Sequence, residues 1–161
     1  MMIVRHIVLA LALSQGAAQS TDWPGAHDTL QSTGLPAAEI QQIVTAIEPN
    51  AFDTPASWTD ELRAARVDLG SGPGLILRGS RLLCGGTGNC QVFVLRKVKD
   101  RWVSLFGDRQ APIADTIRFG PGATNGIKDL TVTANLSATG SSRVTYTFDG
   151  RVYRPRRSTP P

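Results

Sequence analysis

The two cysteines, Cys84 and Cys90, are the residues whose type and spacing point most directly to chemistry. They enclose the five-residue loop Gly-Gly-Thr-Gly-Asn, and an apolar run follows at once. A structural zinc site takes about four ligands, and His27 lies far away in the sequence. A redox Cys-x-x-C pair has a shorter spacing and precedes a helix. The pattern therefore predicts a structural disulfide, in a loop that is either part of a binding site or only a turn.

A catalytic site is the second kind of chemistry to consider. A hydrolase needs a nucleophile, a base and an acid that orients the base. The chain has His27 beside Asp28 but no G-x-S-x-G elbow, and the acids Asp100, Asp108 and Asp149 fall mostly at predicted turns. A base in a flexible segment is not held in position. We therefore expect no catalysis, and a secreted hydrolase of unrecognised type is the alternative.

Positive charge gathers in two places. The chain carries 17 Lys and Arg against 13 Asp and Glu, yet residues 19–150 hold 12 basic and 13 acidic side chains. Nucleic-acid binders carry a basic patch on the folded face, so we expect no nucleic-acid partner. Candidate contacts to an anionic surface are Arg96, Lys97, Lys99 and Arg101 at a hairpin tip, and Arg154, Arg156 and Arg157 in the tail. A solvated tip that discourages edge pairing is the alternative for the first group.

The N-terminus has the layout of a secretory signal peptide. Arg5 is followed by an apolar run over residues 7–13 and then by small residues. The run is shorter than the ~20 apolar residues of a membrane span. We therefore expect a periplasmic or secreted protein, in a compartment where a disulfide persists. The predicted organisation is a signal peptide (1–20), a flexible segment (21–34), a single α+β domain (35–154) and a disordered basic tail (155–161).

One helix is predicted between Pro36 and Pro49. Apolar residues recur there at i, i+3, i+4 and i+7, namely Ile40, Ile43, Val44 and Ile47. This stripe is typical of an amphipathic helix packed on a sheet.

Short strands are predicted along the rest of the chain. A strand ends at Leu69, and a hairpin over 91–106 turns near Lys99-Asp100, with a run over 92–95 buried on both faces. Residues 115–126 read as a short strand and a glycine loop. Asp149-Gly150 predicts a two-residue type I′ turn. Two similar three-stranded units favour one antiparallel sheet. The predicted fold class is α+β, with one short N-terminal amphipathic helix packed on a mostly antiparallel, hairpin-rich β-sheet or half-barrel.

The sequence resembles a diffuse group of uncharacterised exported bacterial domains at three short motifs. These are ARVDLGSGPGLILRG, LCGGTGNCQVFVLRK and YTFDGRVYR. Members of the group share a C-G-x-x-G-N-C loop before an apolar strand and a terminal F-D-G-x-x-Y hairpin. The resemblance spans residues 62–154; it implies a fold and no activity.

A more distant resemblance is to the FG-GAP class of repeats, whose D-x-N-x-D-G loops bind calcium. The matching stretch covers residues 68–74, where Asp68 is the one acid. Calcium takes about six to eight oxygen ligands. We therefore expect no metal site and no cofactor.

Two classes of function remain. We expect an exported binding or interaction module of the bacterial envelope, which recognises an envelope protein or a glycan and makes a weak contact with an anionic membrane surface. An exposed apolar patch beside a rigid loop would favour this class. Polar residues converging on a pocket would favour the hydrolase.

Overall fold

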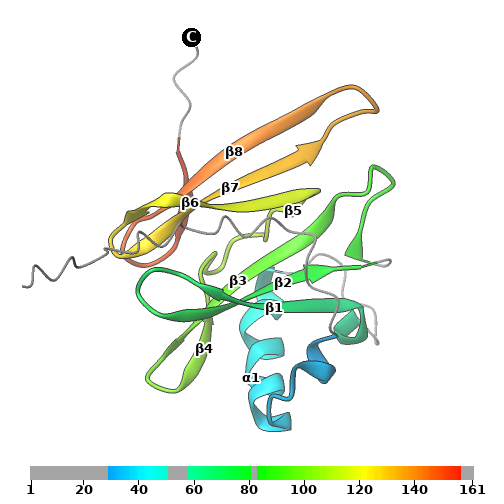
Figure 1. The fold of residues 1–161 in the computed structure, drawn as a ribbon. Helices are drawn as coiled ribbons and strands as arrows, with labels where there is room; N and C mark the ends of the chain where they lie inside the picture. Colours follow the sequence, from blue (N-terminus) through cyan, green and yellow to red (C-terminus); the bar gives the residue numbers. More distant parts are fainter. Residues whose placement is uncertain (1–28, 51–57, 81–82, 157–161) are drawn as a thin grey trace, which may run out of the picture.

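The computed structural model describes residues 29–50, 58–80 and 83–156. These residues form three layers, in which helix α1 covers one face of a five-stranded sheet and a four-stranded sheet covers the other (Figure 1). The α+β fold with one helix and mostly antiparallel hairpins is confirmed. Its strands divide between two sheets instead of forming one sheet or half-barrel.

The elements follow one another along the chain as short segments. In order they are η1 (Leu30–Thr33), α1 (Ala37–Ile47), η2 (Glu48–Asn50), η3 (Trp58–Glu61), β1 (Leu62–Asp68), β2 (Pro73–Gly79), β3 (Cys90–Val98), β4 (Arg101–Ser104), β5 (Ile113–Ala114), β6 (Thr116–Thr124), β7 (Ile127–Asn135), β8 (Ser141–Phe148) and β9 (Tyr153–Pro155).

Each sheet is a meander of successive antiparallel strands. The first has the order β1-β2-β3-β4, and β5 pairs with the start of β3. The second has the order β6-β7-β8-β9. Apart from β5, every strand in either sheet therefore pairs with the strand before it, the strand after it, or both.

Strand β3 is buried on both faces, as the sequence predicts. Val92 and Val94 belong to the core between the sheets, whereas Phe93 and Leu95 belong to the core beneath α1. All four side chains have 0% exposure. A strand covered on both sides reads as a continuous apolar run because neither face meets water.

Helix α1 also follows the prediction. Its stripe faces the first sheet: Ile43 and Ile47 are fully buried, and Ile40 and Val44 pack against the same core. The helix begins directly after Pro36, where the fixed φ of proline suits a helix start.

Residues 29–33 belong to the segment that the sequence predicted to be flexible before the helix. They form η1, in which the side chain of Thr29 accepts a hydrogen bond from the amide of Ser32. Leu30 is fully buried in the core beneath α1. One apolar residue in a polar stretch carries no periodicity, so the sequence pattern did not reveal this anchor. The first 28 residues, with the expected signal peptide, lie outside the described residues.

Two hairpins have turns of the type I′ class. Lys99 and Asp100 both have positive φ (48° and 62°), which confirms the predicted turn between β3 and β4. Asn125 and Gly126 (50° and 79°) form a second such turn in the stretch predicted to be a glycine loop. Strand β6 instead runs up to this turn, with a register shift between Phe119 and Ala123 that accommodates Pro121.

The prediction of a two-residue turn at Asp149-Gly150 is wrong. Phe148 pairs with Tyr153, so four residues connect β8 to β9. The Asp149 carboxylate accepts hydrogen bonds from the amides of Arg151 and Val152, and this local side-chain bonding organises the longer turn.

The C-terminal strand extends into the segment expected to be disordered. Strand β9 includes Pro155, and the amide of Arg156 donates a hydrogen bond to the carbonyl of Thr145 at 2.7 Å. Residues 157–161 lie outside the described residues.

Candidate functional site

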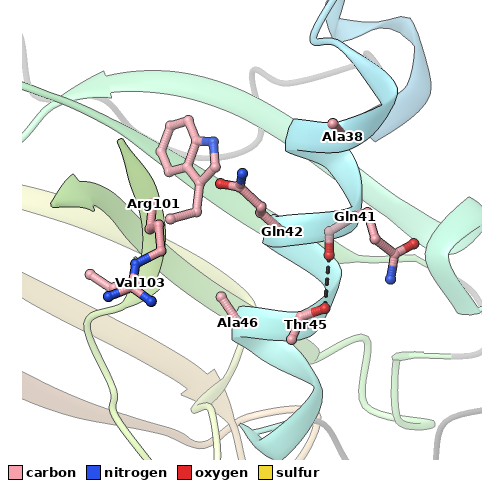
Figure 2. Close-up of a pocket in the computed structure, with 8 residues that line it drawn as sticks. Ala38, Gln41, Gln42, Thr45, Ala46, Arg101 and Val103 are labelled. Atoms are coloured by element: carbon pink, nitrogen blue, oxygen red, sulfur yellow. Dashed lines mark hydrogen bonds between the residues drawn. The ribbon is translucent and has the colours of Figure 1, made fainter. Parts of the chain in front are cut away.

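A groove of about 450 Å³ runs between α1 and β4. Its helical wall presents Ala38, Gln42 and Ala46, which recur at i, i+4 and i+8 and so lie along one side of the helix. Gln42 and Ala46 point toward β4 (Figure 2). The groove is open because two of these three side chains are methyl groups. Its full lining is Ala38, Gln41, Gln42, Thr45, Ala46, Arg101, Trp102 and Val103.

The opposite wall is a sheet edge. Among the described residues, β4 pairs only with β3. The amide of Leu105 donates to the carbonyl of Val94 at 2.7 Å, which makes these residues a hydrogen-bonded pair. Such pairs alternate with non-bonded pairs along an antiparallel ladder. Trp102, opposite Lys97, is therefore in a non-bonded pair, and its backbone N–H and C=O point away from β3 toward the open edge.

Glu39 fixes the position of the helix against this edge. Its carboxylate accepts a hydrogen bond from the indole Nε1 of Trp102 at 3.0 Å and lies 2.9 Å from Nζ of Lys97. These hydrogen bonds, that of Lys97 first, hold the pKa of the Glu39 carboxyl below its ordinary value. Glu39 is also in the first turn of α1, where negative charge complements the helix dipole. Glu39 thus links the helix that forms one wall of the groove to the strand that forms the other.

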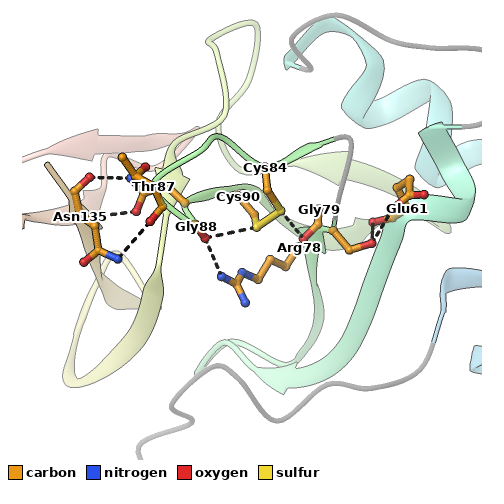
Figure 3. Close-up of a disulfide and its surroundings, with 10 residues drawn as sticks. Glu61, Arg78, Gly79, Cys84, Thr87, Gly88, Cys90 and Asn135 are labelled. Carbon is orange, nitrogen blue, oxygen red and sulfur yellow. Dashed lines mark hydrogen bonds between the residues drawn. A yellow bond between two sulfur atoms is a disulfide. The ribbon is translucent and has the colours of Figure 1, made fainter. Parts of the chain in front are cut away.

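The predicted disulfide is present: Cys84 and Cys90 are bonded, with their Cα atoms 3.9 Å apart. The loop they close packs on the end of β7 (Figure 3). Asn89 is 7% exposed; its Nδ2 donates to the carbonyl of Asn135 at 2.7 Å, and its Oδ1 accepts from the amide of Asn135 at 2.8 Å. The loop therefore joins the two sheets at one end, a structural role that the cysteine spacing did not indicate.

The cations of the predicted hairpin tip lie in different environments. The Arg96 guanidinium lies 5.0 Å from the ring centroid of Phe148, between the sheets. Lys97 binds Glu39 and lies 5.4 Å from the Trp102 ring centroid. Lys99 and Arg101 are exposed at the tip. The structure thus places the four residues that the sequence grouped together in three different environments.

The cations of the tail are likewise divided. Nε of Arg154 lies 2.6 Å from the Asp149 carboxylate in the β8–β9 hairpin. Arg156 is exposed, and Arg157 lies outside the described residues.

Sequence reasoning missed the groove. Ala38, Gln42 and Ala46 were visible only as the side of the helix next to its apolar stripe, and nothing local placed β4 beside them. The one usable signal for the groove was the four-residue spacing of Ala38, Gln42 and Ala46, which places two small side chains on one side of the helix.

Comparison with known proteins adds no relative: no family model, curated protein or solved structure matches the chain. Within the described ranges, no helix is long and apolar enough to cross a membrane. The same ranges contain no group of three metal-ligating side chains.

Proposed function

We propose that the protein is a small exported binding module of the bacterial envelope that captures an extended polypeptide segment in the groove between α1 and β4. The observation that carries this proposal is the orientation of the Trp102 backbone. Its N–H and C=O point away from β3 toward the open edge of the sheet, and Trp102 also lines the groove, so a peptide strand bound there could pair with them. Strand addition to a sheet edge supplies affinity through main-chain hydrogen bonds.

The side chains around the edge indicate the character of the peptide. Gln42 offers an amide donor and acceptor beside the bound main chain, and Arg101 places a positive charge at the same groove. Lys99, in the turn that precedes β4, is exposed. We expect an extended segment with an acidic side chain near Arg101, because opposite charges favour encounter and fix register.

The compartment is part of the proposal. The signal-like N-terminus and the Cys84–Cys90 disulfide support export, since disulfides persist in oxidising compartments.

Selection from a library of random linear peptides, displayed on phage, tests the binding function. Enriched peptides should bind the wild type and lose at least about tenfold in affinity against Ala38→Phe, which fills the groove from an exposed position. Ala37→Phe is the matched control, because Ala37 is the exposed neighbouring alanine and does not line the groove. Hydrogen exchange of the Trp102 amide should slow when the peptide binds.

Two results would reject the proposal. One is equal binding of the selected peptides to Ala38→Phe and Ala37→Phe. The other is binding without protection of the Trp102 amide, which would indicate side-chain recognition of a different ligand, such as a glycan.

A further inference from the structure

Two arginines lie side by side on neighbouring strands of the first sheet. Arg63 of β1 and Arg78 of β2 are direct partners in the antiparallel register. Their strand neighbours show which way they face: Val67 and Ile76, on the same side by alternation, belong to the core between the sheets. Both arginines therefore project from the first sheet toward the second, on the face opposite the α1–β4 groove.

This pairing is unfavourable on its own. Like charges directly opposite each other destabilise a pair of strands. The only hydrogen bond of either guanidinium within the described residues is a long one, from Nη2 of Arg78 to the carbonyl of Gly88 at 3.5 Å (Figure 3). Nη1 of Arg63 and Nε of Arg78 are buried without a hydrogen-bond partner. Each guanidinium thus has a buried donor that no group of the described residues accepts.

The surroundings do not neutralise the pair. Burial lowers the pKa of the Arg78 guanidinium, and the charge of Asp115, between β5 and β6, acts in the opposite direction. One carboxylate against two guanidiniums leaves a positive site. Both residues are only partly buried, so a small ligand can reach them from solvent.

We propose that Arg63 and Arg78 form a binding site for a phosphate group, independent of the groove and of the proposed peptide. A guanidinium presents its donors in a planar fork that matches two oxygens of a phosphate. Two forks from adjacent strands bind one tetrahedral anion better than either alone, and the anion removes the repulsion between them. The phosphate is either free or the headgroup of an anionic lipid.

The test uses the full mature chain and inorganic phosphate, with chloride at matched ionic strength as the reference. Phosphate should raise the melting temperature of the wild type saturably. Arg63→Met and Arg78→Met keep the aliphatic stem and remove the charge, so each should lose most of this rise. Arg66→Met is the matched control, because Arg66 is an exposed arginine of β1 on the opposite face, and it should respond like the wild type.

The chloride arm separates ligand binding from a structural role. Without phosphate, the two site variants should melt at or above the wild-type temperature, because they relieve like-charge repulsion. Lower melting temperatures in chloride with an undiminished response to phosphate would overturn the proposal. An absent or non-saturating response of the wild type to inorganic phosphate would overturn it as well.

The source of the phosphate is decided in a parallel arm. Vesicles of phosphatidylglycerol should bind the wild type more than Arg78→Met if the site takes a lipid headgroup. Equal vesicle binding with a retained difference in free phosphate assigns the site to the soluble anion. Neither outcome depends on peptide binding, so Ala38→Phe should behave like the wild type in every arm.

Discussion

Asn89 binds both backbone groups of Asn135 with its single side-chain amide, at 2.7 and 2.8 Å. The amide of Asn89 thereby takes the place of a neighbouring strand at the last residue of β7. It also connects the disulfide loop of the first sheet to the second sheet, 46 residues further along the chain. The contact is nearly closed to water, so its loss leaves buried polar groups unpaired.

We expect Asn89→Ala to lower the free energy of unfolding by about 2 kcal/mol, since an unsatisfied buried group loses its hydration. Asn89→Asp should cost more at neutral pH, because a carboxylate then faces the Asn135 carbonyl. The pKa of the carboxyl group introduced by this substitution should be raised in the folded state. Stability of Asn89→Asp should therefore be highest below the unfolded-state pKa and fall as the pH rises through the folded-state pKa. Urea unfolding across this range checks the prediction; a flat profile would contradict it.

Removal of the disulfide should weaken the fold without abolishing it. Cys84 and Cys90 close a short loop, for which the chain-entropy model gives about 2 kcal/mol. The pair Cys84→Ala and Cys90→Ala should remain folded, because both cores consist mainly of residues outside this loop. When Asn89→Ala is added to this pair, the total loss of unfolding free energy should be smaller than the sum of the two separate losses. The reason is that an open loop holds Asn89 less well. Full additivity in denaturant titrations would show that the two features act separately.

Gln91 is expected to limit stability. It is 3% exposed, and neither atom of its side-chain amide has a hydrogen-bond partner among the described residues. Gln91 lies on the same face of β3 as Phe93 and Leu95, which is the face toward α1. Gln91→Leu should raise the free energy of unfolding by about 1 to 2 kcal/mol. Gln41→Leu, an exposed position of α1, should change it by less than about 0.5 kcal/mol. A destabilised Gln91→Leu would mean that the amide has a use in the native protein.

Glu39 should make the attachment of α1 dependent on pH. Its folded-state pKa is lowered from 4.5, so its stabilisation is present above that value and is lost as the pH falls through the lowered folded-state pKa. Glu39→Gln should be less stable than the wild type at neutral pH, and the difference should vanish in acid. Asp68 and Asp149 also have lowered pKa values, but they are unchanged in the variant and cancel in the comparison. Unfolding of both proteins by urea over the acid range measures the difference curve. A difference that persists in acid would assign the effect to packing and not to charge.

Local patterns predicted the local elements well. The helical stripe from Ile40 to Ile47, the apolar run of β3 and the turn at Lys99-Asp100 each depend on residues close together in the sequence. The turn at Asp149 was mistaken because its carboxylate bonds to nearby amides, which a dipeptide preference does not describe.

Long-range pairing could not be predicted. Whether eight hairpin strands form one sheet or two depends on contacts such as Asn89 with Asn135 and Asp68 with Lys128, the latter at 2.8 Å. The groove exists because α1 lies beside the edge of β4, and neither segment specifies the other. The Arg63–Arg78 pair likewise appears only when the register of β1 and β2 is known.

The meander order of both sheets has a consequence for how the chain acquires its structure. Strands that follow one another in sequence close small loops, which costs little entropy and favours rapid formation. The first sheet requires little beyond Ser104, and Cys84 and Cys90 are six residues apart. In a chain that becomes available N-terminus first, oxidation of this pair can therefore precede the arrival of β7. We expect the disulfide to act early in folding, as a preformed platform on which the second half of the protein docks.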